Sequence, residues 1–119
     1  MSFPAPYDNV TMLKIPVREV YLMTMYKYHA VIERENPEEN TGAFIVSFPD
    51  LDNVFTDGET MLEAVENANE VLELMLETML EEGDTFNPPS HVKDILPQLS
   101  DNASLLLVDV DVNIPEGAL

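Results

Sequence analysis

Alternation of apolar and polar residues predicts strands in the middle of the chain. Between residues 26 and 33 every second residue is apolar, which is the period of a half-buried strand; these positions are Tyr26, Tyr28, Ala30 and Ile32. The polar residues 35–42 are typical of a hairpin loop. A second strand is predicted over residues 43–48, where Pro49 ends the pairing because proline has no N–H to donate. A short third strand is expected over residues 53–56.

A long amphipathic helix follows. Thr60 and Glu63 form a T-x-x-E capping box, in which each side chain satisfies a free N–H at the helix start. Apolar residues then recur at helical spacing and Gly83 ends the helix; the face consists of Met61, Val65, Ala68, Leu72, Met75 and Met79, widened by Ala64, Val71, Leu76 and Leu80.

The helix is followed by a connector and a last strand. Residues 87–103 read as the connector, and alternation through Leu106, Val108, Val110, Val112 and Ile114 predicts the strand. The order β-β-β-α-β predicts an α+β fold in which one helix packs on one face of a mixed sheet. Three prolines interrupt residues 1–24. We therefore expect residues 1–25 to form a weakly ordered N-terminal extension and residues 26–119 to form one domain.

The charge of the chain is strongly negative and unevenly distributed. The formal net charge is -18, from five Lys and Arg against 23 Asp and Glu. Four of the five cations lie in residues 1–34, whereas residues 35–119 hold only Lys93 against 20 acids. Such a surface repels phosphate backbones and anionic membranes. We expect a basic protein as partner, no direct nucleic-acid binding and no membrane binding.

Glutamates form a single stripe on the predicted helix. No Lys or Arg interrupts them, so neighbouring like charges destabilise the isolated helix. The stripe is either a solvated face or a docking surface for a basic partner; its candidate contact residues are Glu63, Glu66, Glu70, Glu73 and Glu77. The turn at residues 48–52 is the second candidate contact surface, through Phe48, Asp50 and Asp52.

Candidate catalytic chemistry is sparse. The aspartates near residues 50–57, with Asp109 and Asp111, have the residue type for Mg²⁺, but Asp is also common in turns for backbone reasons. His29 and His91 have no Ser–Asp partners in a recognisable pattern, and no glycine-rich phosphate loop exists. We expect no enzyme activity, no cofactor and no metal. The absence of cysteine and of a signal-peptide pattern predicts a cytoplasmic protein.

Several short motifs form a set that covers most of the chain beyond residue 25. They are YHAVIE at residues 28–33, FIVSFPDL at 44–51, TDGET at 56–60 and PPS at 88–90. Within the predicted helix they include Glu63-Ala64, Asn67-Ala68 and Glu70. Together they resemble the N-terminal domain of HicB-family antitoxins, and residues 105–112 fit the same pattern.

The resemblance implies a reduced RNase H-like fold without nuclease activity. It also implies a partner: HicA toxins are small basic ribonucleases with a catalytic histidine, and HicB domains cover that surface. The expected function is therefore an antitoxin that neutralises a HicA-type mRNA-cleaving toxin, with homo-oligomers formed through a sheet edge. Because the chain ends at Leu119, we expect no C-terminal DNA-binding domain. The alternatives are a vestigial metal-dependent nuclease and a solitary RNA- or protein-binding domain.

Overall fold

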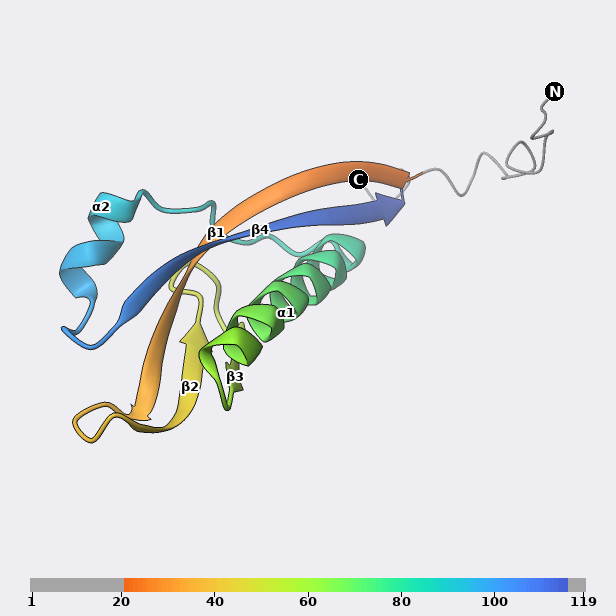
Figure 1. Ribbon diagram of the computed structural model, residues 1–119. Coiled ribbons are helices and arrows are strands. Elements are labelled where there is room, and N and C mark those ends of the chain that lie inside the picture. Colours follow the sequence, from red (N-terminus) through yellow and green to blue (C-terminus); the bar gives the residue numbers. More distant parts are fainter. Residues whose placement is uncertain (1–20, 116–119) are drawn as a thin grey trace, which may run out of the picture.

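A four-stranded sheet and one long helix make up the body of the molecule (Figure 1). The computed structural model describes residues 21–115. The strands are β1 (Tyr21–Asn36), β2 (Thr41–Ser47), β3 (Phe55–Gly58) and β4 (Ser104–Pro115), arranged in the order β3-β2-β1-β4. The helices are α1 (Met61–Glu82), the short α2 (Val92–Ile95) and the 3₁₀ turn η3 (Leu96–Gln98). Within residues 21–115, no helix is long and apolar enough to span a membrane.

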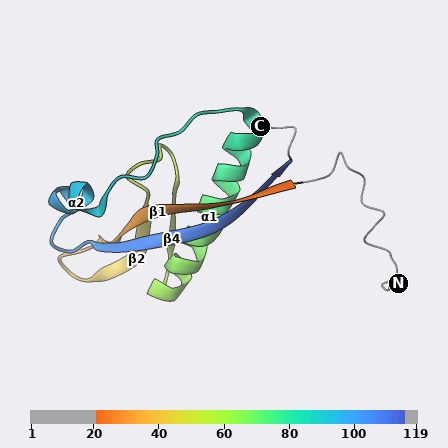
Figure 2. The same cartoon turned by 90° about the horizontal axis from the view of Figure 1, so that it is seen from above.

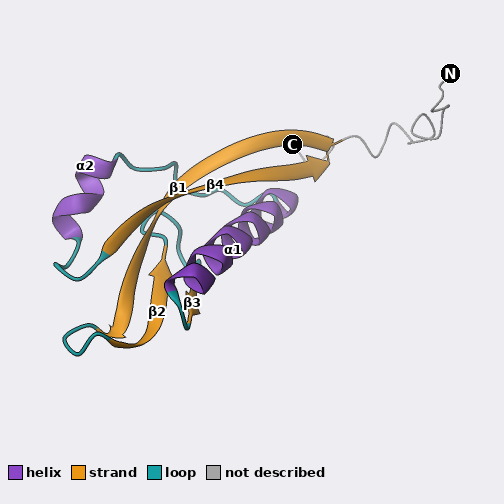
Figure 3. Ribbon diagram, viewed as in Figure 1, coloured by secondary structure: helices purple, strands orange, loops and turns teal. Residues whose placement is uncertain are grey.

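The sheet is antiparallel throughout, so the prediction of a mixed sheet is wrong. β1 pairs antiparallel with both β2 and β4, and β2 pairs antiparallel with β3. A helix that directly joins two strands favours a parallel pair, but here the connector after α1 runs back along the molecule before β4 begins (Figure 3). This second reversal turns β4 antiparallel to β1.

Strand β1 is longer than its apolar alternation indicates. It begins at Tyr21, five residues before the predicted start, because β4 extends to Pro115. Every residue of β4 pairs with β1, from Tyr21 opposite Pro115 to Ile32 opposite Ser104. Figures 1 and 2 show these two strands running side by side as a ribbon. Residues 21–25, predicted as part of a weakly ordered extension, therefore belong to the sheet, whereas residues 1–20 lie outside the described part.

Helix α1 occupies the predicted residues, because its ends are fixed locally. Thr60 Oγ1 accepts a hydrogen bond from Glu63 N at 3.1 Å, and Gly83 adopts the left-handed conformation with φ 76°. The buried line of the helix is Ala64, Ala68, Leu72 and Leu76. This line is rotated from the predicted centre: Met61 is 40% exposed, and Val65, Met75 and Met79 flank the core.

The small residues of the buried line let α1 approach the sheet closely. A Cβ on Gly58 would lie 2.4 Å from Ala64 N, so only glycine fits where β3 meets the helix. The core between α1 and the sheet contains side chains with almost no exposure; the largest are Tyr28, Leu72, Leu76, Val46, Val54, Val108 and Val112.

Two further predictions need correction. The third strand lies at Phe55–Gly58, two residues later than predicted, because Asn53 has φ 62° and the turn extends to Val54. The connector also contains α2 and η3, which pack on the opposite sheet face from α1. There Ile95 and Leu99 lie beside Val31, and the Ser100 hydroxyl donates to Glu33 Oε2 at 2.6 Å.

Candidate functional site

The outer face of α1 carries the predicted glutamate stripe. Glu66, Glu70 and Glu73 are exposed and Glu77 is half-buried. Glu63 is also exposed, but its Oε1 accepts a hydrogen bond from Glu59 N at 2.6 Å, so its carboxylate takes part in the helix cap. Four of the five candidate glutamates therefore remain outside the cap on one helix face, and α1 has no basic residue to neutralise them.

Two leucines interrupt this acidic face, and the sequence reasoning missed both. Leu62 is 68% exposed and Leu74 is 60% exposed. Leu74 lies in a shallow hollow with Glu70, Glu73 and Glu77. A purely solvated face has no need of leucine, and exposed apolar side chains ringed by charge are typical of binding surfaces. A helical wheel that compared leucines with glutamates would have found them.

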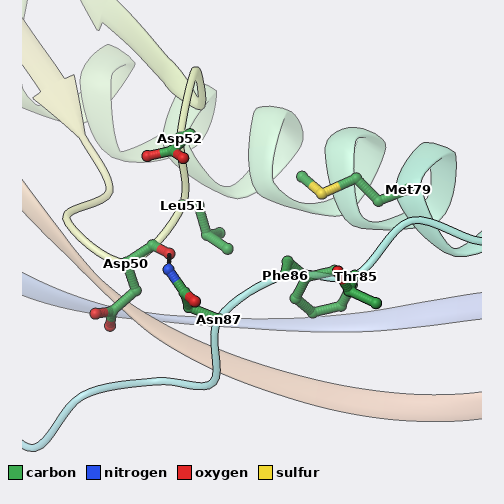
Figure 4. Close-up of a pocket in the computed structure, with 7 residues that line it drawn as sticks. All are labelled: Asp50, Leu51, Asp52, Met79, Thr85, Phe86 and Asn87. Atoms are coloured by element: carbon green, nitrogen blue, oxygen red, sulfur yellow. Dashed lines mark hydrogen bonds between the residues drawn. The ribbon is translucent and has the colours of Figure 1, made fainter.

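The second candidate surface, the turn after β2, is held by hydrogen bonds to the connector. Asp50 accepts two of them from Ser90, at 2.7 Å from the backbone N–H and 2.6 Å from the hydroxyl. The Asn87 side chain donates to the Asp50 carbonyl at 3.3 Å (Figure 4). The motifs around residues 50 and 90, far apart in the sequence, thus contact each other. Asp50 positions the connector.

Tyr28 fixes the same connector from the sheet. Its hydroxyl donates to the Asn87 carbonyl at 2.5 Å. Burial, and after it the negative charge of Asp50 and the neighbouring Tyr26, raise the pKa of Tyr28 to about 12. The hydroxyl therefore stays protonated and keeps donating throughout the neutral range.

The other residues predicted at this turn have separate environments. Phe48 is 3% exposed and belongs to the core cluster, so its side chain presents almost no surface here, and its contact with a partner stays a prediction. Asp52 is exposed. Asp52 lines a cavity of about 240 Å³ together with Met79 and Phe86. Figure 4 shows these side chains.

The aspartates considered for a metal site are not brought together. Asp109 and Asp111 are exposed on the face of β4 opposite to the buried Val108, Val110 and Val112, whereas Asp52 lies near α1. In the part of the chain that the structure describes, no three acidic or histidine side chains converge in a metal-binding arrangement.

Comparisons with known proteins identify the family. Residues 28–117 match the model described as HicB_like antitoxin of bacterial toxin-antitoxin system. A comparison with characterised protein sequences found no match.

Solved structures share the fold. A toxin–antitoxin complex from Streptococcus pneumoniae matches with 22% identity and a TM-score of 0.59, over 74% of this chain and 70% of that chain. A HicA3 and HicB3 toxin–antitoxin complex matches with 26% identity and a TM-score of 0.56, over 71% and 98%. The N-terminal domain of Burkholderia pseudomallei antitoxin HicB matches with 24% identity and a TM-score of 0.54, over 69% and 94%. Because this family model covers residues 28–117, which is most of the chain, the chain belongs to the HicB-like antitoxins of bacterial toxin–antitoxin systems.

Proposed function

We propose that this antitoxin binds and neutralises a small basic HicA-type toxin that cleaves mRNA, and that the outer face of α1 is the contact surface. The observation that carries this proposal is the combination of Glu66, Glu70, Glu73 and Glu77 with the exposed Leu74 on one helix face. Leucine supplies apolar area to bury, and the carboxylates complement a cationic surface and speed encounter. One solved relative is a complex of HicA3 with HicB3, which supports a HicA-type partner.

The proposed mode of action is steric and electrostatic. A ribonuclease must expose cationic groups to hold the RNA backbone. An acidic helix that occupies those groups competes with RNA for the same surface, so inhibition requires no reaction on the antitoxin. We propose on this ground that the chain has no catalytic activity. Its net charge of -18 also supports the proposal that it does not bind nucleic acid directly.

Self-association is a second part of the proposal. Ile45 and Phe55 lie on adjacent strands of the sheet face that α1 does not cover, and they are 39% and 65% exposed. Apolar residues exposed together on a sheet are typical of a contact between proteins. We propose that a second copy covers them. The likeness to a reduced RNase H fold stays a prediction.

We expect a small basic ribonuclease to be encoded beside this chain. The test is binding to that protein, with its catalytic histidine replaced so that host cells survive. We expect the pair to co-purify. Replacing Glu66 and Glu73 with Lys should weaken the affinity about tenfold and flatten its salt dependence, because charges at the interface rim steer encounter and are screened by salt.

A matched control is available in the hairpin between β1 and β2. Glu38 and Glu39 are equally exposed, so their replacement by Lys gives the same change in net charge away from α1. If both double variants lose affinity equally, net charge and not the α1 face accounts for binding. Failure of the wild-type pair to associate would contradict the proposed function itself.

A further inference from the structure

Strand β4 forms one edge of the sheet and leaves one side of its backbone unpaired. It follows β1 in the order β3-β2-β1-β4, and no further strand lies beyond it within residues 21–115. Its pairing with β1 continues residue by residue from Ser104 to Pro115 without a register shift. The outer N–H and C=O groups of β4 therefore recur at every second residue, in the spacing that an added strand requires.

The edge at β4 lacks most of the features that prevent strand addition. Proteins protect edges with charged side chains, lysine above all, with proline, with bulges or with very short strands. β4 is twelve residues long, contains no Lys or Arg, has its proline only at the last position, and carries Asp109 and Asp111 as its charged residues. The opposite edge, β3, has four residues. β4 is therefore the edge that can accept a strand.

The side chains of β4 indicate which strand it accepts. Asp109 and Asp111 are exposed on the face away from α1, and Leu107 on the same face is 51% exposed. Antiparallel pairing of two β4 strands about Val110 would set Asp109 of one copy opposite Asp111 of the other, and like charges in opposite positions are destabilising. A strand with Lys or Arg at alternate positions would instead form attractive cross-strand pairs.

We infer that the outer edge of β4 accepts a β-strand of the basic toxin, so that the sheet of the antitoxin continues into its partner. This inference rests on the proposed function and adds a second contact, made mainly by backbone hydrogen bonds. Backbone pairing supplies affinity that does not depend on side-chain identity, while alternate side chains supply specificity. Asp109 and Asp111 select cationic residues on the incoming strand.

Hydrogen exchange measured by NMR tests the inference residue by residue. In the free antitoxin, β4 amides that point to β1 are protected and the intervening outward amides exchange fast. In the complex with the histidine-replaced basic protein encoded beside this chain, the fast amides within residues 105–111 should slow by at least about tenfold. Protection at alternate residues is a result that a side-chain contact or a general stabilisation would not produce.

A pair of charge reversals provides the matched control. Asp111→Lys and Asp57→Lys each reverse one exposed aspartate on an edge strand, and each lies opposite an apolar residue of the neighbouring strand, Met25 and Ile45. We expect Asp111→Lys to weaken binding about tenfold and Asp57→Lys to change it less than about twofold.

Three results would overturn the inference. If the proteins bind, the β4 amides keep their free-state rates and the two variants bind alike, the edge is not a contact, although the proposed function stands. If all β4 amides of the free antitoxin are already protected in a concentration-dependent way, a second copy occupies the edge. If the basic protein does not bind at all, the proposed function fails and this inference fails with it.

Discussion

The two faces of the sheet are built from the same strands, but their apolar residues are buried to different extents. On the face under α1, Ala30, Val46 and Val112 have no exposed surface, whereas on the opposite face Ile45, Phe55 and Leu107 are 39%, 65% and 51% exposed. On that side, α2 and η3 pack near Val31. Core packing thus explains one face, whereas the exposed apolar residues of the other face agree with the proposed contact with a second copy.

The largest expected effect distinguishes a buried from an exposed leucine of α1. Leu72 is fully buried, so Leu72→Ala should lower the free energy of unfolding by about 2–5 kcal/mol, as buried leucine truncations do. Leu74→Ala, two residues along, removes the same atoms from a side chain that is 60% exposed and should change stability by less than about 0.5 kcal/mol. Urea unfolding measures both. Equal losses would mean that the helix faces are wrongly assigned.

An intermediate effect is expected for the hydrogen bond that joins Tyr28 in the sheet to Asn87 in the connector. Tyr28→Phe leaves the Asn87 carbonyl without its donor and should cost about 0.5–1.5 kcal/mol. Because the folded-state pKa of Tyr28 is raised from 10.0 to about 12, its contribution is fully present below pH 10 and is lost as the pH rises toward 12.

The pH dependence of the unfolding free energy distinguishes this hydrogen bond from packing of the Tyr28 ring. The difference in unfolding free energy between wild type and Tyr28→Phe should stay constant up to pH 10 and shrink above it. Tyr26→Phe serves as the control, since the Tyr26 ring keeps its edge contact with Phe86 at a centroid distance of 6.0 Å. A constant difference up to pH 12 would show that the hydroxyl is not held as described.

The smallest effect on stability is expected on the uncovered face. Phe55→Ser should change the unfolding free energy by less than about 0.5 kcal/mol because the ring is 65% exposed. Self-association measured by sedimentation equilibrium should decrease, since the proposed contact loses its largest side chain. The neighbouring Val54→Ser, at a position 2% exposed, should instead destabilise the fold. Unchanged association of Phe55→Ser would remove Phe55 from the contact.

Features fixed by nearby residues could be predicted from the sequence. The ends of α1 depend on Thr60, Glu63 and Gly83, which act within a few residues of the helix they terminate. The alternation of β4 likewise places Val108, Val110 and Val112 in the core without reference to other segments. In each example the local pattern is sufficient because a single face is buried.

Features that depend on distant segments could not be predicted. The direction of β4 depends on the path of the connector, and α2 is a four-residue helix too short to show periodicity. Asp50 was proposed as a partner contact because its charge is visible in the sequence, whereas its hydrogen bonds to Ser90, forty residues away, are not. Leu74 is a different case: its position beside Glu70 and Glu77 follows from helical spacing alone, and it was missed because glutamates were compared only with glutamates.

The position of β1 inside the sheet also affects when the protein can fold during its synthesis. β1 pairs with β4, and Tyr21 lies opposite Pro115. Val108, Val110 and Val112, which complete the core under α1, are synthesised at least 80 residues after the β1 residues that they pair with. Contacts of such high sequence separation slow folding and keep apolar surface exposed until the second strand has been made. The core under α1 is therefore complete only once β4 has left the ribosome, and until then β1 and α1 expose apolar side chains that the folded protein buries.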